Sequence, residues 1–223
     1  MAKYCHTVHS HPYAWDEVAG AIFQRYPNPF ATHVLSEDTV ERGLLQPNVL
    51  YSKRFLTKTN KLPKWSEKFV IGIKRYVPLV EESIVDRDAK VITTYTRNVG
   101  LSRFMTAIEK VEYRRDPHDP SKTVAVKEAW IESGLYGLRS AVKNYGVERF
   151  KQNCTRATDG FNHVLAHFHH QQHYINEMRV KKWNEMKHKG EVLRANARHA
   201  AEVAKAHSVV RAEESEGSTK PST

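Results

Sequence analysis

Apolar positions recur every three or four residues from about Tyr136 to Phe168, and this spacing predicts one long amphipathic helix. The residues on its apolar face are Leu138, Val142, Tyr145, Phe150, Cys154, Ala157, Phe161, Val164, Leu165 and Phe168. Beside this face, Arg149, Asn153 and Arg156 follow one another at i, i+4 and i+7, so their side chains point the same way. A helix with so much apolar surface needs a large partner to cover it.

The chain before this helix reads as a series of strands with one short helix near its start. Apolar residues from Trp15 to Phe23 share one helical face, and Pro27 and Pro29 end that helix. Alternating polarity and turn residues predict strands over 3–9, 34–42, 50–57, 76–85, 91–98, 104–114 and 123–131. We therefore expect an α+β fold in which a curved antiparallel sheet of about seven strands is wrapped around the long C-terminal helix.

The residues after about 172 differ in composition from the rest of the chain. Residues 173–212 are rich in Ala, Glu, Lys and Arg, with sparse apolar positions, which predicts a solvated helix or a partly disordered extension. Residues 213–223 are predicted to be disordered. We therefore divide the chain into a folded domain, 1–172, and a basic extension, 173–223.

The charge of the chain favours an anionic partner. The net charge is +10 and the pI about 9.5, with 25 basic against 18 acidic residues up to Gln172 and 10 against 7 after it. The folded part is therefore itself cationic, which suits nucleic acid, an acidic protein or an anionic membrane. No apolar run approaches the roughly 18 to 20 residues of a membrane span.

Motifs of catalysis are not found in this sequence. It has no glycine-rich phosphate loop, no Gly-x-Ser-x-Gly and no His-Glu-x-x-His. The acidic pairs Glu81-Glu82 and Glu37-Asp38 fall on alternating strand faces, and we interpret them as solvent-exposed charges. Cys5 and Cys154 form neither a disulfide framework nor a zinc set, and Cys154 on the apolar helix face favours a small buried side chain. We predict no enzyme, no cofactor and no metal.

Several of the thirteen histidines gather near the end of the long predicted helix. His163, His167 and His170 share one face, and His169 and His173 form an i, i+4 pair, a spacing also found at zinc sites. Because no carboxylate or thiolate accompanies them, we interpret this group as an ordinary polar helix end.

Three other basic features stand out. In residues 61–74, lysines alternate with apolar side chains, which fits either a packed surface helix or a lid that touches a membrane. Arg25, at the end of the first helix, is by itself typical of a capping residue. Arg54 and Lys58 share one strand face. If that face is concave, two buried cations would call for an anionic ligand.

Specific runs of residues resemble a known family. They are Tyr26-Pro27-Asn28-Pro29, His33-Val34-Leu35-Ser36-Glu37-Asp38, Phe55-Leu56-Thr57-Lys58-Thr59-Asn60, Glu128-Ala129-Trp130 and Arg149-Phe150-Lys151-Gln152-Asn153. In order and spacing over residues 1–170, they resemble the PRELI/Ups (PRELI/MSF1) family of mitochondrial lipid-transfer proteins, and the PRELI branch in particular.

This resemblance implies a START-like helix-grip domain that holds one lipid between the curved sheet and the long helix, under an Ω-loop lid at about Lys61–Lys74. It implies phosphatidic acid as the cargo, carried across the intermembrane space to the cardiolipin-containing inner membrane for cardiolipin synthesis. It also implies a small helical partner with twin CX9C disulfides. We expect a protein of the intermembrane space without a cleaved presequence.

The resemblance also assigns residues to these roles. The head-group residues fall at Arg25, His33, Arg54, Lys58, Arg149, Asn153 and Arg156. The lid and membrane residues fall at Lys61, Leu62, Lys64, Trp65, Lys68, Phe69, Val70 and Ile71. The family often has lysine at the positions of Arg149 and Arg156, so the charge is kept while the geometry of the phosphate contact differs.

Three alternatives stay open at this point. The same fold could carry phosphatidylserine. The basic surface could instead serve a nucleic-acid-binding module, although the aromatic residues lie on apolar faces rather than in exposed stacking positions. A structural adaptor with a vestigial cavity would contain no extractable lipid.

Overall fold

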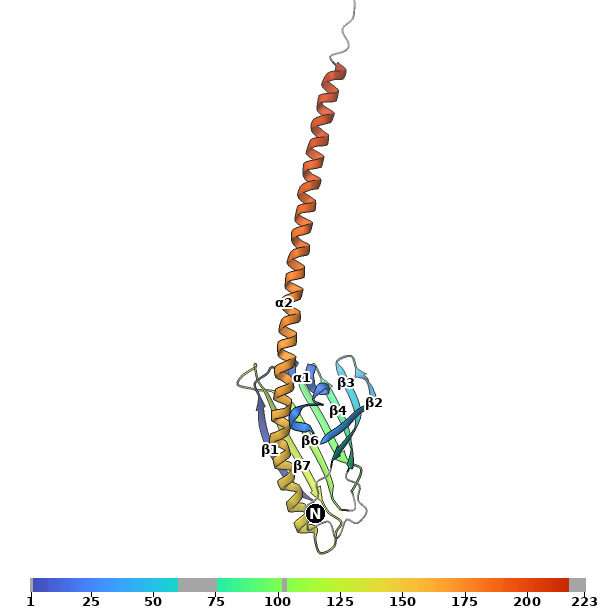
Figure 1. Cartoon of the computed structure of the whole chain (residues 1–223), viewed down its shortest axis with the longest axis vertical. Helices are drawn as coiled ribbons and strands as arrows, with labels where there is room; N and C mark the ends of the chain where they lie inside the picture. Colours follow the sequence, from blue (N-terminus) through green and yellow to red (C-terminus); the bar gives the residue numbers. More distant parts are fainter. Residues whose placement is uncertain (1, 60–75, 102–103, 217–223) are drawn as a thin grey trace, which may run out of the picture. The chain divides into compact units, whose positions relative to one another are not determined.

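The computed structural model describes residues 2–59, 76–101 and 104–216, and it divides into two compact units, Met1–His169 and His170–Thr223. The first unit contains a seven-stranded antiparallel sheet with the strand order β1-β7-β6-β5-β4-β3-β2 (Figure 1). Its strands are β1 (Lys3–His11), β2 (Val34–Gln46), β3 (Val49–Thr59), β4 (Tyr76–Asp86), β5 (Val91–Asn98), β6 (Thr106–Arg115) and β7 (Thr123–Glu132). From β2 to β7 each strand pairs with the next one in sequence, while β1 pairs with β7.

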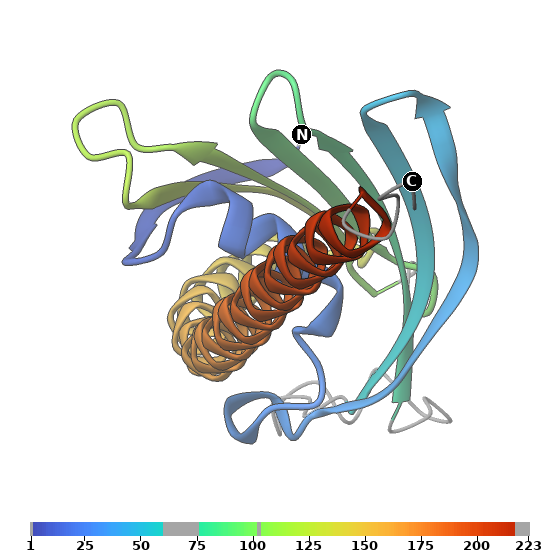
Figure 2. The same cartoon turned by 90° about the horizontal axis from the view of Figure 1, so that it is seen from above.

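The helical elements of the first unit lie on the concave side of this sheet, and the last of them continues into the second unit. They are α1 (Trp15–Ala21), the 3-10 turns η1 (Ile22–Gln24) and η2 (Pro29–Ala31), and α2 (Arg139–Glu216). Figure 2 shows the sheet curving around α1 and the first turns of α2. The predicted fold class, an antiparallel sheet wrapped around a long C-terminal helix, is therefore confirmed.

The element boundaries differ from the predicted ones mainly at two places. β2 continues to Gln46 instead of ending at residue 42, because as an edge strand with exposed side chains it pairs with β3 up to the turn. β6 begins at Thr106, because the Leu101 carbonyl accepts hydrogen bonds from the amides of Phe104 and Met105 and so forms a tight turn before the strand.

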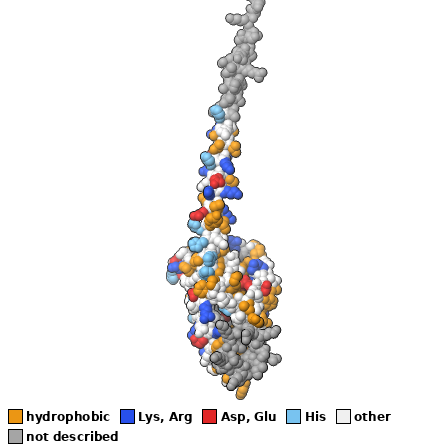
Figure 3. All heavy atoms as spheres, in the orientation of Figure 1, with side chains coloured by type: hydrophobic (Ala, Val, Ile, Leu, Met, Phe, Trp, Pro, Cys, Tyr) orange, Lys and Arg blue, Asp and Glu red, His pale blue; other side chains and the backbone are white. Residues whose placement is uncertain are grey.

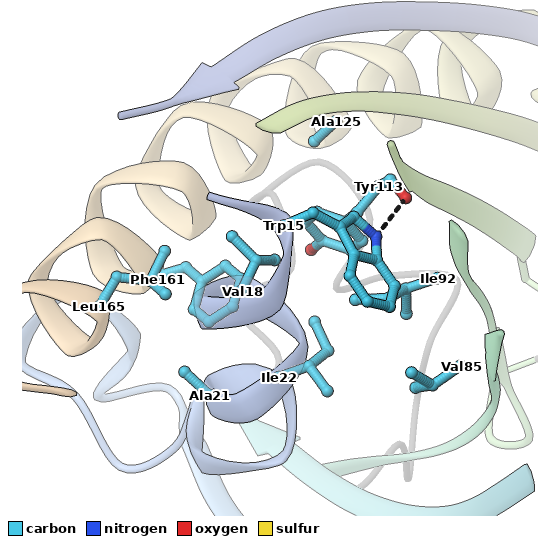
Figure 4. Close-up of a cluster of buried hydrophobic side chains, with 10 residues drawn as sticks. All are labelled: Trp15, Val18, Ala21, Ile22, Val85, Ile92, Tyr113, Ala125, Phe161 and Leu165. Atoms are coloured by element: carbon cyan, nitrogen blue, oxygen red, sulfur yellow. Dashed lines mark hydrogen bonds between the residues drawn. The ribbon is translucent and has the colours of Figure 1, made fainter. Parts of the chain in front are cut away.

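Apolar side chains of α1, the sheet and α2 form the main core (Figure 4). Trp15 is 2% exposed, and its indole nitrogen donates to the Tyr113 carbonyl oxygen at 3.3 Å. Phe161 and Leu165 of α2 belong to the same cluster, so this end of the helix is fixed against the sheet through α1. Burial of such large side chains contributes on the order of 2 kcal/mol each.

A second group of contacts holds the beginning of α2 against β7. Val147, Phe150 and Cys154 pack with Ala129 and Ile131, and the buried environment predicted for Cys154 is confirmed. Gly146 permits this close approach. A Cβ atom at this position would lie 2.7 Å from the Cγ2 atom of Ile131. The two groups of contacts are separated along α2, and the space between helix and sheet is bounded by both.

The described part of the second unit is the continuation of α2. Side chains of residues 171–189 and 191–199 are exposed, as expected for a solvated helix. Figure 3 shows basic, acidic and hydrophobic side chains interspersed along it. The helix includes residues 213–216, where the sequence predicts disorder, and residues 217–223 lie outside the described part. Over the described residues, no helix combines the length and apolar character that crossing a membrane requires.

Candidate functional site

Two adjoining cavities lie between the concave face of the sheet and α2. The first has a volume of about 920 Å³ and the second about 910 Å³, each including space open to solvent. They have five lining residues in common, namely His33, Lys58, Glu109, Phe150 and Asn153. Because the two cavities meet at these residues, we treat them as the two ends of one site.

The two ends differ in chemistry. Charged and polar groups gather in the first cavity, where Arg25, Glu81, Lys127 and Arg156 contribute to the lining. The second cavity is lined largely by apolar side chains, among them Val77, Leu79, Leu101, Phe104, Met105, Ala107, Ala129 and Ile131. The site therefore offers a charged end and an apolar end to a single elongated molecule.

Six of the seven residues predicted to contact a head group line this site. His33, Lys58 and Asn153 line both cavities, Arg25 and Arg156 line the first, and Arg149 lines the second. Arg54 lines neither cavity among the described residues. The sequence pattern therefore brings six of these side chains together around one space, and it places Arg54 behind the wall of that space.

Arg25 is positioned by the turn that follows α1. Its Nε donates to the Ile22 carbonyl oxygen at 2.9 Å, which is the capping contact expected from its place at the end of a helix. The Asn28 side chain donates to the Arg25 carbonyl oxygen at 2.7 Å, and Asn28 in turn lies against Gly160 of α2. These contacts fix the backbone from which the Arg25 guanidinium reaches the sheet.

A buried network of charges joins Arg25 to Arg54. The Nη2 of Arg25 donates to both carboxylate oxygens of Glu81, at 2.7 and 2.8 Å. Arg54, with 0% exposure, donates to Glu81 and also to Glu37. The interpretation of Glu81 and Glu37 as solvent charges is wrong, because an inward strand position places each carboxylate beside a buried guanidinium. The expected anionic ligand for Arg54 is likewise replaced by these internal carboxylates.

The electrostatics of the two carboxylates follow from this arrangement. Burial alone would raise the pKa of Glu81, but the charges and hydrogen bonds of Arg25 and Arg54 lower it to about 2. Burial raises the pKa of Glu37, and the charge of Arg54 opposes that effect. Glu81 is therefore ionised at any physiological pH.

The remaining predicted cations form a second group with a different environment. Within the described part of the chain, Lys58, Arg149 and Arg156 have no carboxylate partner within ion-pair distance. Burial lowers the pKa of the half-buried His33, and the charges of Lys58, Arg149 and Arg156 lower it further. The three cations and the imidazole, together with Glu109, thus border a space that an anion can occupy.

One buried cation of the site, Lys127, was not predicted from the sequence. Its Nζ donates to the Cys154 carbonyl oxygen at 3.0 Å and to the Thr158 hydroxyl at 2.6 Å. Burial lowers the pKa of Lys127 to about 8. A signal was present, because Lys127 has the same strand parity as the buried Ala125 and Ala129, which places it on the inward face.

His11 was missed because it lies beyond the end of the predicted strand. It is 1% exposed, lines the first cavity, and its Nδ1 lies 2.6 Å from the Asn162 side-chain oxygen. Burial lowers the pKa of His11 to about 4, so the ring is neutral at pH 7. The sequence predicts a short edge strand over residues 3–9. β1 is indeed an edge strand, but it extends to His11.

Two further predicted features are the lid and the group of histidines near the end of the predicted helix. The lid at 61–74, with all of its predicted membrane residues, lies outside the described residues. In the described part of the chain, no group of three or more His, Cys, Asp or Glu side chains is arranged to hold a metal ion. The histidines of the helix contact other residues, since the rings of His163 and His167 lie 4.7 Å apart and His169 contacts Glu17.

Comparison with solved structures supports the same architecture. The crystal structure of TTHA0849 from Thermus thermophilus matches with a TM-score of 0.50 and 11% sequence identity, over 74% of this chain and 97% of that chain. At this level of identity the likeness concerns the fold alone.

Comparison of sequences identifies the family. The chain is 43% identical over 167 residues to "PRELI domain-containing protein 1, mitochondrial" of Gallus gallus, covering 74% of this chain and 78% of the relative. It is 33% identical over 160 residues to "Protein UPS1, mitochondrial" of Saccharomyces cerevisiae, covering 71% and 90%. Residues 16–171 match the model of the PRELI-like family. The chain therefore belongs to the PRELI-like family.

Proposed function

We propose that this protein carries one molecule of phosphatidic acid at a time from one mitochondrial membrane to the inner membrane, where it supplies cardiolipin synthesis. The observation on which this proposal depends is the site with a cationic end and an apolar end. A phospholipid has the same division between head group and acyl chains. The proposed role is that of a carrier, in which no covalent bond of the cargo changes.

The apolar end can bury the acyl chains of a lipid, and this burial is the largest energetic requirement of lipid transfer. Each CH₂ group moved from a bilayer into water costs about 0.8 kcal/mol, so a lipid with about 30 of them requires roughly 25 kcal/mol of replacement burial. Side chains such as Leu79, Phe104 and Ile131 provide a surface of this kind. Such a lining favours a two-chain lipid over a small soluble anion.

The cationic end favours a compact anionic head group. Phosphatidic acid ends in a phosphomonoester with a charge of roughly −1 to −2. We assign its phosphate to Lys58, Asn153 and Arg156, with Arg149, His33 and Arg25 around it. Bulkier head groups would have to fit among the same side chains, and phosphatidylserine is the nearest rival cargo.

The cellular setting of this proposal comes from the family. The relatives in Gallus gallus and Saccharomyces cerevisiae are both named mitochondrial. We propose the intermembrane space as the compartment and a small twin-CX9C helical protein as the partner. Residues 61–74 would form the lid, with Trp65 and Phe69 entering the interface of an anionic membrane and the neighbouring lysines contacting lipid head groups.

Lipid transfer between vesicles tests the proposal directly. Lys58→Glu places a carboxylate beside the phosphate, so we expect transfer of phosphatidic acid to fall by about 100-fold or more, the effect of reversing one buried charge contact. The matched control is Lys53→Glu on the same strand, because Lys53 lies on the other face and pairs with Glu82. This control should transfer normally.

Two outcomes would contradict the assignment. Transfer by Lys58→Glu at the wild-type rate, with an unchanged unfolding curve, would remove the head group from this end of the cavity. A wild-type protein that moves phosphatidylserine faster than phosphatidic acid from otherwise identical phosphatidylcholine vesicles would replace the proposed cargo with its rival.

A further inference from the structure

Glu81 lies at an unusual place for a carboxylate, in the wall of a cavity proposed to bind an anion. Its side chain is 5% exposed, and it contributes to the lining of the first cavity. Arg25 and Arg54 both donate to it, and the hydroxyls of Ser83 and Thr96 lie 3.4 and 3.5 Å from its oxygens. Two guanidinium groups and two hydroxyls form the surroundings that a phosphate group would itself require.

We propose that Glu81 is a built-in competitor of the cargo: in the empty protein it occupies the anion-binding face of Arg25, and it thereby speeds release of the lipid phosphate. This inference rests on the proposed function, because it takes Arg25 to be one of the phosphate-binding groups. It assigns to Glu81 a role in setting how long the cargo stays bound.

The hydrogen bonds of Arg25 provide the first step of the argument. Its Nε donates to the Ile22 carbonyl oxygen, and its Nη2 donates to both oxygens of Glu81. A guanidinium binds an oxyanion best through two parallel hydrogen bonds. Both nitrogens of the Nε–Nη2 edge already have acceptors, so a phosphate can bind that edge only by displacing Glu81 from Nη2.

The position of Arg54 provides the second step. Arg54 lines neither cavity among the described residues, yet it holds Glu81 from behind. It keeps Glu81 ionised and in place even when Arg25 turns to another anion. The loaded site then holds a carboxylate beside a phosphate, and their repulsion raises the energy of the loaded state relative to the empty one.

Glu81→Gln tests this inference, since it keeps the shape of the side chain and removes its charge. Wild type and variant are loaded with fluorescent phosphatidic acid, and its release to phosphatidylcholine acceptor vesicles is timed. We expect release from Glu81→Gln to be roughly tenfold slower, which is what one charge-assisted hydrogen bond is worth. A purely structural role predicts the opposite, because a disturbed cavity wall would hold the lipid less well.

The matched control is Glu37→Gln. Glu37 also pairs with Arg54 but lines neither cavity among the described residues. The Glu37→Gln variant should lower the unfolding temperature without slowing release of the lipid. Should Glu37→Gln slow release as much as Glu81→Gln, the effect would belong to the charge of the network as a whole and the inference would be wrong.

A second variant covers the case in which Glu81→Gln folds poorly. Arg54→Met combined with Glu81→Gln removes one cation and one anion together, so the buried charge stays balanced. It should also release phosphatidic acid more slowly than wild type. Release at the wild-type rate or faster in both variants would overturn the inference, whereas a wild-type protein that takes up no phosphatidic acid would overturn the proposed function itself.

Discussion

The cations predicted to contact a head group fall into two groups that look alike in sequence and differ in structure. Arg25 and Arg54 are buried in ion pairs with Glu81 and Glu37. Lys58, Arg149 and Arg156 border the same space, and over the described residues they have no carboxylate partner. In the empty protein the first group is paired with carboxylates of the protein itself, and the second is open to an external anion.

Strand register explains why two neighbours on one strand face fall into different groups. Arg54 and Lys58 both point inward from β3. In the pairing of β3 with β4, Arg54 lies opposite Glu81, whereas Lys58 lies opposite Val77. The cross-strand neighbour therefore decides whether an inward cation becomes part of the wall or part of the binding site.

The largest effect that separates the two groups is on stability. Arg54→Met leaves Glu81 and Glu37 buried with one cation fewer, and we expect it to lower the free energy of unfolding by about 3–5 kcal/mol. Lys58→Met removes a half-buried charge without a carboxylate partner and should change this free energy by less than about 1 kcal/mol. Urea unfolding of the three proteins measures both values. Equal losses of unfolding free energy in Arg54→Met and Lys58→Met would contradict the division into two groups.

The same dependence on strand register explains which parts of the fold and of the candidate site could be predicted from the sequence. Alternation of polarity is a local property, so it predicted the strands and placed Arg54 and Lys58 on one strand face, without deciding whether that face is concave. The pairing of Arg54 with Glu81 joins residues 27 positions apart in sequence, and it depends on the register across the segment that connects β3 and β4. Sequence spacing alone does not determine that register.

Lys127 shows the opposite situation, in which a local signal existed but was given too little weight. Its parity within β7 places it inward, beside Ala125 and Ala129. A lysine at such a position is unusual because burial of an ammonium group is costly. The cost is reduced by the Cys154 carbonyl and the Thr158 hydroxyl of α2, and these partners become visible only once the helix is packed on the sheet.

A somewhat smaller effect should appear on acidification, and it belongs to the paired group. The pKa of Glu81 is about 2 in the folded protein against an ordinary value of 4.5, so its contribution to stability is present above pH 4.5. That contribution, about 3 kcal/mol, is lost as the pH falls from about 4.5 towards 2. Stability curves of wild type and Glu81→Gln between pH 6 and 2.5 measure it.

The matched variant for this measurement is Lys58→Met, which should keep the acid dependence of the wild type. His11 also makes stability depend on pH, but at higher pH. Because its pKa is about 4 in the folded protein against an ordinary value of 6.5, its contribution to stability is lost as the pH falls from about 6.5 to 4. If wild type and Glu81→Gln lost stability in parallel below pH 4.5, the carboxylate would not be the group responsible.

The smallest effect concerns the group without carboxylate partners, and it is a pH dependence of cargo binding. In the empty cavity, burial and the charges of Lys58, Arg149 and Arg156 lower the pKa of His33, so the imidazole is neutral at pH 7. A bound phosphate adds negative charge beside the ring and raises its pKa, so binding is coupled to proton uptake. Wild-type protein should therefore retain phosphatidic acid about three- to tenfold better at pH 6 than at pH 8 relative to His33→Gln.

The comparison with His33→Gln is necessary because the phosphate of the lipid titrates in the same range and affects both proteins equally. The ratio of lipid retained by the two proteins isolates the imidazole, and a ratio that is constant from pH 6 to 8 would exclude it. Glu81 could not produce such a dependence, because its pKa of about 2 lies far below this range. A response near neutral pH that is absent from His33→Gln would therefore locate the phosphate beside His33, among the cations that the protein itself leaves without an anion.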